Sequence, residues 1–125
     1  MVKCDEVRDM THDQEQCSKQ LMPVRDALDV LNGKWKIPII IALSYGNIRF
    51  KELHRQISIS PKMLSKELKD LEGHQLVQRT VYDTIPVSVE YALTPYAKTL
   101  QNVIGALHEW GSQHRKKMMK KEVSR

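Results

Sequence analysis

Three lysines share one side of a predicted helix in the middle of the chain. Lys62, Lys66 and Lys69 are four and three residues apart, and side chains at these separations are neighbours on a helix surface. Their ammonium groups can donate charge-assisted hydrogen bonds to anionic oxygens, including those of phosphate. The leucines of the same segment have a helical spacing of their own: Leu64, Leu68 and Leu71. The pattern predicts a helix with a narrow buried side and a cationic side facing solvent.

The residues before this helix predict how it begins. Ser60 suits the N-cap position, because its hydroxyl can accept a backbone N–H from two or three residues later, and Pro61 fits the first helical position. Another helix is expected over residues 48–57, and residues 58–60 leave room only for a tight turn between the two. A short second helix that is apolar behind and cationic in front suits the major groove of DNA.

Two segments with a period of two follow. Residues 76–82 and 87–93 alternate between apolar and polar, and residues 83–86 are expected to form the hairpin loop between them. Arg79 has two interpretations: it contacts a phosphate from the hairpin, or it pairs with Glu90 across the strands. Two helices with a tight turn and a hairpin predict a mainly α fold with a β-hairpin wing, the winged helix-turn-helix.

Positive charge is concentrated on this unit. Residues 49–69 hold six basic and two acidic side chains, whereas the net charge of +5 and the pI near 9.3 of the whole chain could come from its basic end alone. Most charge runs are solvated helix faces, but the grouping on one side of a capped helix favours double-stranded DNA as the partner. Lys69 and Arg49 are expected at phosphates, which position without specifying. The residues expected nearest the bases are Ser60, Lys62, Met63 and Lys66. The full predicted set is Arg49, Ser60, Pro61, Lys62, Met63, Ser65, Lys66, Lys69 and Arg79.

The chain divides into three predicted stretches. Residues 1–22 are a flexible acidic leader, residues 23–114 are the winged domain with its dimerisation helices, and residues 115–125 are a basic tail. The tail either contacts the DNA that flanks the site or is disordered, and disorder is the preferred expectation. Within the middle stretch a helix at about 34–45 is apolar nearly all round, which indicates burial. Pro38 requires this helix to begin late or to kink.

Two further helices predict a homodimer. The first runs from Pro23 to about Leu31, and the last begins at Pro95 and can exceed about 20 residues, or roughly 30 Å. An apolar stripe of that length extends beyond the core of one subunit, and two-fold symmetry would place two recognition helices about 34 Å apart on an inverted repeat. The predicted interface residues are Val24, Leu28, Leu31, Ile104, Leu107 and Trp110.

Other classes of protein have less support. The longest apolar run, residues 37–43, is far shorter than the ~20 residues of a membrane span. The first residues lack the apolar stretch of a secretion signal, so no membrane partner is expected and the cytoplasm is the expected location. His108 and His114 are six residues apart rather than the four of a zinc-protease motif. No metal, cofactor or enzyme active site is therefore predicted.

The two cysteines, Cys4 and Cys17, have neither the number nor the spacing of a zinc site or a disulfide framework. Reduced, inert thiols are expected. An alternative makes Cys17 a redox sensor, although only Lys19 nearby would favour its thiolate. Trp35 and Trp110 could indicate a ligand site, but at helical spacing such residues are more often part of the core. A small-molecule effector site at the dimer seam is a further hypothesis.

Several segments, in the same order along the chain, resemble the HxlR-type family of bacterial transcription regulators, which are relatives of the MarR winged-helix proteins. The matching segments are 32–35, 48–53, 59–72, 89–94 and Glu109-Trp110-Gly111. The resemblance covers about residues 22–112. It implies a dimeric regulator of transcription, with the helix after Ser60 in the major groove and the hairpin as its wing.

Three positions depart from the family pattern. Met22 stands where members often have a cysteine before the proline of the first helix, and Ser88 stands where a basic residue often precedes Val-Glu-Tyr. Gln75 replaces a common glycine, so a left-handed backbone there would carry about 1 kcal/mol of strain. The overall prediction is a sequence-specific transcriptional regulator. The alternative is a winged-helix module that uses the same face for a protein partner, and a nonspecific nucleic-acid binder comes third.

Overall fold

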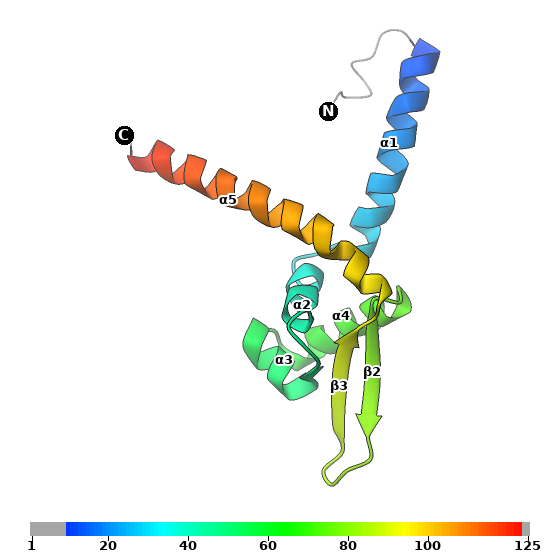
Figure 1. Cartoon of the computed structure of the whole chain (residues 1–125), viewed down its shortest axis with the longest axis vertical. Coiled ribbons are helices and arrows are strands. Elements are labelled where there is room, and N and C mark those ends of the chain that lie inside the picture. Colours follow the sequence, from blue (N-terminus) through cyan, green and yellow to red (C-terminus); the bar gives the residue numbers. More distant parts are fainter. Residues whose placement is uncertain (1–9, 124–125) are drawn as a thin grey trace. The chain divides into compact units, whose positions relative to one another are not determined.

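The chain forms two compact units that divide between Lys34 and Trp35. The computed structural model describes residues 10–123, with side chains for residues 14–120. The first unit contains helix α1, Met10–Val30, and the second contains all the other elements (Figure 1).

Helix α1 begins well before the predicted start at Pro23, which lies inside it. The prediction was wrong because it gave too much weight to the proline. A proline within a helix removes one hydrogen bond and costs about 3 kcal/mol. Residues 14–22, however, are mostly Gln, Glu, Lys, Leu and Met, which are strong helix formers. The apolar side chains of Met22, Val24 and Leu28 on this helix are exposed.

The second unit begins with helix α2, Lys36–Leu43. Its late start is the one that Pro38 requires, because the proline falls in the first turn, where no helical donor is needed. Strand β1, Ile48–Arg49, and helix α3, Phe50–Ile57, follow. The sequence predicted residues 48–49 as helical, which was wrong, since Ile48 and Arg49 pair with Tyr91 and Glu90 on a neighbouring strand.

Helix α4, Pro61–Gly73, is the second helix of the helix-turn-helix. The predicted tight turn before it is confirmed: Ser58 has a left-handed backbone with φ 59° and ends α3. The Ser60 hydroxyl accepts the backbone N–H of Met63 at 3.2 Å, as expected of an N-cap.

The wing consists of strands β2, Val77–Tyr82, and β3, Ser88–Leu93, which pair in antiparallel fashion and extend from the body of the unit (Figure 1). Strand β3 is central in a three-stranded sheet of order β1-β3-β2. Gln75, just before β2, keeps the left-handed conformation of the glycine that it replaces in the family pattern, with a φ of 63°.

The core of the second unit lies where α2, α3 and α4 pack against the base of the wing. Its buried apolar residues are Ile39, Ile40, Leu43, Leu53, Ile59, Leu64, Leu68, Leu71, Leu76, Val77, Tyr91 and Ala97. The prediction that α2 is buried all round was wrong at Ile41, whose side chain is 40% exposed.

The chain ends in a 3₁₀ helix, η2, Tyr96–Leu100, and a long α-helix, α5, Gln101–Val123. Thr94 caps this region as predicted, since its hydroxyl accepts the backbone N–H of Ala97 at 3.1 Å. The expectation of disorder after residue 115 was wrong as far as Val123, because the lysines and methionines there are good helix formers. None of the helices described over residues 10–123 has the length and hydropathy needed to cross a lipid bilayer.

Candidate nucleic-acid interface

The outer side of α4 is the cationic surface that the sequence predicted. Lys62, Lys66 and Lys69 are exposed, and none of the three forms an ion pair with a carboxylate of the described residues. The opposite side of the helix, with Leu64 and Leu68, is fully buried. The lysines therefore face solvent and are not covered by other described parts of the chain.

The remaining predicted contacts at the start of α4 are also on the surface. Ser60, Pro61 and Ser65 are exposed, and the side chain of Met63 is 38% exposed. Met63 thus places an apolar group among the lysines, which suits contact with a thymine methyl group. Contact of these residues with DNA stays a prediction.

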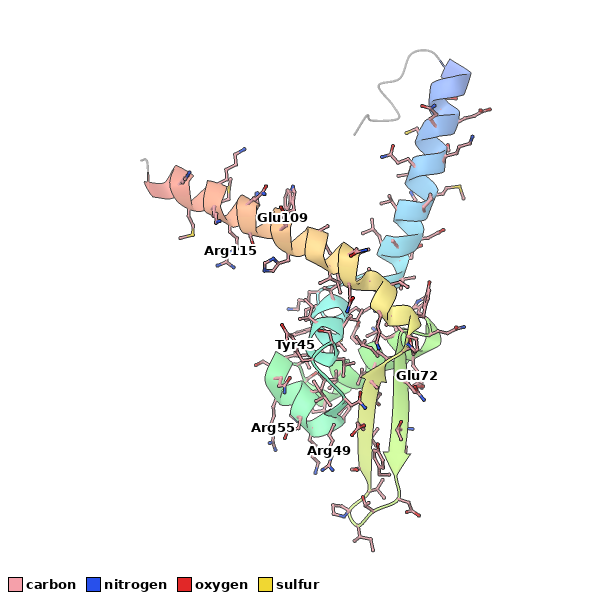
Figure 2. All side chains as sticks on the ribbon, viewed as in Figure 1. Tyr45, Arg49, Arg55, Glu72, Glu109 and Arg115 are labelled. Carbon is pink, nitrogen blue, oxygen red and sulfur yellow. The ribbon has the colours of Figure 1, made fainter. Side chains whose placement is uncertain are left out.

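A groove of about 850 Å³ lies between the start of α3 and the wing. It is lined by the basic residues Arg49, Lys51, Arg55 and Arg79 together with the acidic residues Glu52 and Glu90. Figure 2 shows the side chains of Arg49 and Arg55 extending in the direction of the hairpin loop, away from α5. The predicted DNA-binding set contains Arg49 and Arg79, whereas Lys51 and Arg55 were counted only in the positive charge of residues 49–69; they line the groove because α3 packs beside the wing.

The structure settles one interpretation of Arg79. Arg79 lies opposite Tyr91, and Glu90 lies opposite Thr80. The predicted pairing of Arg79 with Glu90 is therefore wrong, because the hairpin register differs by one residue from the expected one and a one-residue shift moves a side chain to the other face of the sheet. A phosphate contact for Arg79 stays a prediction.

Glu90 instead connects the wing to the body of the unit. Its carboxylate accepts hydrogen bonds from Asn47 Nδ2 and from the Tyr82 hydroxyl, both at 3.2 Å. The first bond comes from the loop after α2 and the second from β2. The carboxylate therefore helps to fix the direction in which the wing extends.

The tip of the wing is apolar. Ile85 is fully exposed and Val87 is 61% exposed, and Asp83 is the only charged residue between Arg79 and Glu90. Positive charge near the wing is thus confined to its base, where Arg79 faces the groove.

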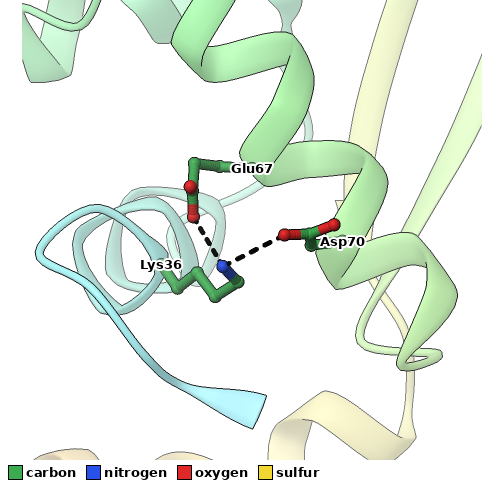
Figure 3. A network of polar contacts seen from close by, with 3 residues as sticks. All are labelled: Lys36, Glu67 and Asp70. Carbon is green, nitrogen blue, oxygen red and sulfur yellow. Dashed lines mark hydrogen bonds and ion pairs between the residues drawn. The ribbon is translucent and has the colours of Figure 1, made fainter. Parts of the chain in front are cut away.

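A polar network beneath α4 was missed by sequence reasoning (Figure 3). Lys36 Nζ donates a hydrogen bond to Glu67 Oε2 at 2.7 Å and to Asp70 Oδ2 at 3.4 Å. The side chains of Lys36 and Glu67 are 4% and 11% exposed, whereas that of Asp70 is 52% exposed. The only local signal was a glutamate next to the leucine stripe of α4.

Burial of the Lys36 ammonium by itself lowers the pKa of this group. The hydrogen bonds and negative charges of Glu67 and Asp70 outweigh burial, so the pKa of Lys36 is raised above its ordinary value. Lys36 is therefore charged at neutral pH and forms a true ion pair inside the unit.

The residues predicted for a dimer interface have unusual exposure for apolar groups. On α1, Val24 is 42% and Leu28 is 63% exposed. On α5, Leu107 and Trp110 are 50% and 65% exposed. Leu31 and Ile104 are partly exposed.

Cys17 on α1 is disulfide-bonded in the structure, so the expectation of a reduced thiol was wrong. The count and spacing of cysteines had argued only against a multi-bridge framework, and they did not bear on a single bond. The other cysteine, Cys4, lies outside the described residues.

A helix-turn-helix formed by α3 and α4, with a hairpin wing after it, defines the winged helix-turn-helix class. The chain belongs to the HxlR-like helix-turn-helix family, whose pattern matches residues 30–119.

Relatives of known sequence agree. The chain is 37% identical over 97 residues to the HTH-type transcriptional regulator YtcD of Bacillus subtilis, covering 77% of each protein. It is 47% identical over 91 residues to an HTH-type transcriptional regulator of Halalkalibacterium halodurans, covering 71% of this chain and 80% of that protein.

Solved structures agree as well. The redox regulator HypR in its reduced form aligns with a TM-score of 0.72 at 37% identity, over 78% of this chain and 98% of that one. A MarR-family regulator from Enterococcus faecalis V583 aligns with a TM-score of 0.67 at 30% identity, over 91% of this chain and 99% of that one. The protein is thus a transcriptional regulator with a helix-turn-helix DNA-binding domain, and its family consists of regulators rather than enzymes.

Proposed function

We propose that the protein binds a specific inverted repeat in double-stranded DNA as a homodimer, with α4 of each protomer in the major groove. The observation that carries the proposal is the exposed row of Lys62, Lys66 and Lys69 on the side of α4 opposite its buried leucines. A helix presented in this way can bring its first residues to base edges.

The groove beside the wing supports a continuous phosphate contact. Arg49 and Arg79 line it from β1 and β2, so both guanidinium groups would meet the DNA backbone next to α4. Arginine binds phosphate through two parallel hydrogen bonds, which would fix the register of the protein on the duplex. The apolar wing tip would leave base reading to α4.

The exposed apolar residues of α1 and α5 support the homodimer. Val24 and Leu28 on α1, and Leu107 and Trp110 on α5, are large side chains that a monomer leaves in water. Complete burial of a fully exposed side chain of this kind is worth about 1.5–3 kcal/mol, and these residues are 42–65% exposed, so a second copy that covers them would gain roughly half of that for each.

A groove of about 820 Å³ next to α5 also supports a homodimer interface. Ile41, Ile104 and Leu107 are among its lining residues, and coverage by a second copy would account for the exposure of Ile41. This groove is also the site that we propose for a small-molecule effector, since its volume is in the range of ligand pockets. We place the protein in the cytoplasm, where its DNA target would be.

Selection of bound sequences from random DNA duplexes, with the mass of the complex measured in parallel, tests the proposal. The expected result is an inverted repeat, two protein chains per duplex, and an affinity that falls steeply with salt concentration. A winged-helix module that binds only proteins would enrich no sequence and show no salt-dependent DNA binding. Either of these results would refute the proposal.

A further inference from the structure

The Lys36 network lies on the flank of α4 that separates its leucines from its lysines. With 3.6 residues per turn, Asp70 is about 60° around the helix from Glu67, and Lys66 is about 40° beyond Asp70. Glu67 itself adjoins the buried leucines. Lys36 therefore forms its hydrogen bonds with α4 at the boundary between the buried side and the cationic side of this helix (Figure 3).

We propose that Lys36 is a positioning residue for DNA recognition: from α2 it fixes the rotation of α4 about its axis and holds Asp70 away from Lys66. The inference rests on the function proposed above and names a residue that touches no DNA. Its two parts, rotation and charge, follow from different contacts.

Lys36 can fix the rotation of α4 because its hydrogen bonds, unlike apolar packing, are directional. Burial of Leu64, Leu68 and Leu71 holds this side of α4 against the core but specifies its angle less sharply than a hydrogen bond does, because the hydrophobic effect is non-directional. A buried ammonium bonded to carboxylates on successive turns is directional, because each hydrogen bond weakens steeply when its angle changes. The exposed side chains of Lys62 and Met63 are thereby held at a fixed angle relative to the rest of the unit.

Lys36 can keep Asp70 from pairing with Lys66 because of where these two residues lie along α4. Lys66 and Asp70 are four residues apart, a separation at which opposite charges pair on a helix surface. In the structure Asp70 is bonded to Lys36, while Lys66 is exposed and pairs with no described carboxylate. Lys36 also neutralises carboxylates that would otherwise repel phosphates near the recognition side.

A double variant, Lys36→Met with Glu67→Met, separates positioning from simple stabilisation. Replacement of one partner would leave a buried charge unpaired and destabilise the fold, whereas replacement of both by apolar residues is often neutral or stabilising. The double variant should therefore fold and unfold thermally at or above the wild-type temperature. In this variant, α4 would no longer be held by the directional hydrogen bonds of Lys36.

The DNA probes are the best duplex selected from random sequence and a scrambled duplex of the same length. For the double variant we expect the ratio of the two affinities to fall roughly tenfold, about the discrimination carried by one base pair. Lys19→Met is the matched control, because it removes an exposed lysine of α1 and should leave the ratio unchanged. A folded double variant with the wild-type ratio would overturn the proposal.

Asp70→Asn tests the charge part. In the wild type, where Asp70 is already bonded to Lys36, the substitution should change affinity for the selected duplex less than about twofold. In the double variant, where Asp70 can turn to Lys66, it should raise the affinity by at least about threefold. If Asp70→Asn changed the affinity equally in the wild type and in the double variant, the proposal that Lys36 holds Asp70 away from Lys66 would be overturned. A wild-type protein that discriminates between no duplexes would instead refute the proposed function, and the inference with it.

Discussion

Lys69→Ala tests how α4 meets DNA, because Lys69 is expected at a phosphate and not at a base. The side chain is exposed and pairs with no described carboxylate, and its neighbours Leu68 and Leu71 form the buried side of the helix. Alanine is a better helix former than lysine, so the substitution removes one cation per protomer and leaves the fold intact.

The size of the effect follows from counterion release. Each phosphate contact contributes about 0.9 to the slope of log K against log salt, so a dimer that loses two contacts should lose about 1.8. Between 50 and 200 mM salt, one contact changes affinity roughly 3.5-fold and two contacts roughly 12-fold. The affinity deficit of the variant should therefore shrink roughly 12-fold over this range.

Fluorescence anisotropy titrations over this range of salt, on the selected and scrambled duplexes, measure both quantities. Lys69→Ala should weaken binding to the two duplexes by similar factors. The matched variant Met63→Ala removes a neutral, partly exposed side chain and should lower discrimination while leaving the slope unchanged. A loss of discrimination by Lys69→Ala, with no change in slope, would refute the phosphate assignment.

Three further predictions concern stability and assembly. Gln75→Gly should raise the free energy of unfolding in urea by about 0.5–1 kcal/mol, because glycine adopts the positive φ of this position without strain; a decrease would contradict the assignment of strain. The raised pKa of Lys36 means that its contribution is complete below the ordinary lysine pKa of about 10.4 and is lost as pH rises through the higher pKa of the folded state. Urea unfolding from pH 8 to 12 should thus show the wild type losing stability relative to the Lys36→Met, Glu67→Met variant only at the alkaline end, and a constant difference would show that Lys36 is not the titrating group. Trp110→Ala should weaken dimerisation roughly 30-fold if Trp110 is a central interface residue, and sedimentation at a series of concentrations that gave the wild-type dissociation constant would exclude it from the interface.

The helix-turn-helix was predictable because its signals are local. The Ser60 cap, the proline after it and the leucine spacing all lie within a dozen residues of one another, and each acts through the backbone or through one helix face. The tight turn before Ser60 follows from the same few residues. No information from distant parts of the chain was needed to orient the lysines of α4.

The features that were missed depend on distant partners. Lys36 and Glu67 are 31 residues apart, and a glutamate beside a leucine stripe looks like an ordinary surface residue until the cation on α2 is known. Strand β1 has only two residues, too few for a periodic pattern, and it forms because β3 has a free edge beside it. The hairpin register was misjudged for a related reason: one extra loop residue moves Arg79 from opposite Glu90 to opposite Tyr91.

The outer side of α4 carries no residue of the buried core. Lys62, Met63 and Ser65 are exposed and do not belong to the buried core, so they can be exchanged at little cost to stability. After gene duplication, a copy of this regulator can therefore acquire a new target sequence through a few substitutions on one surface. Glu67 is the exception on this helix, because its substitution alone would leave a buried ammonium ion without its nearest counterion.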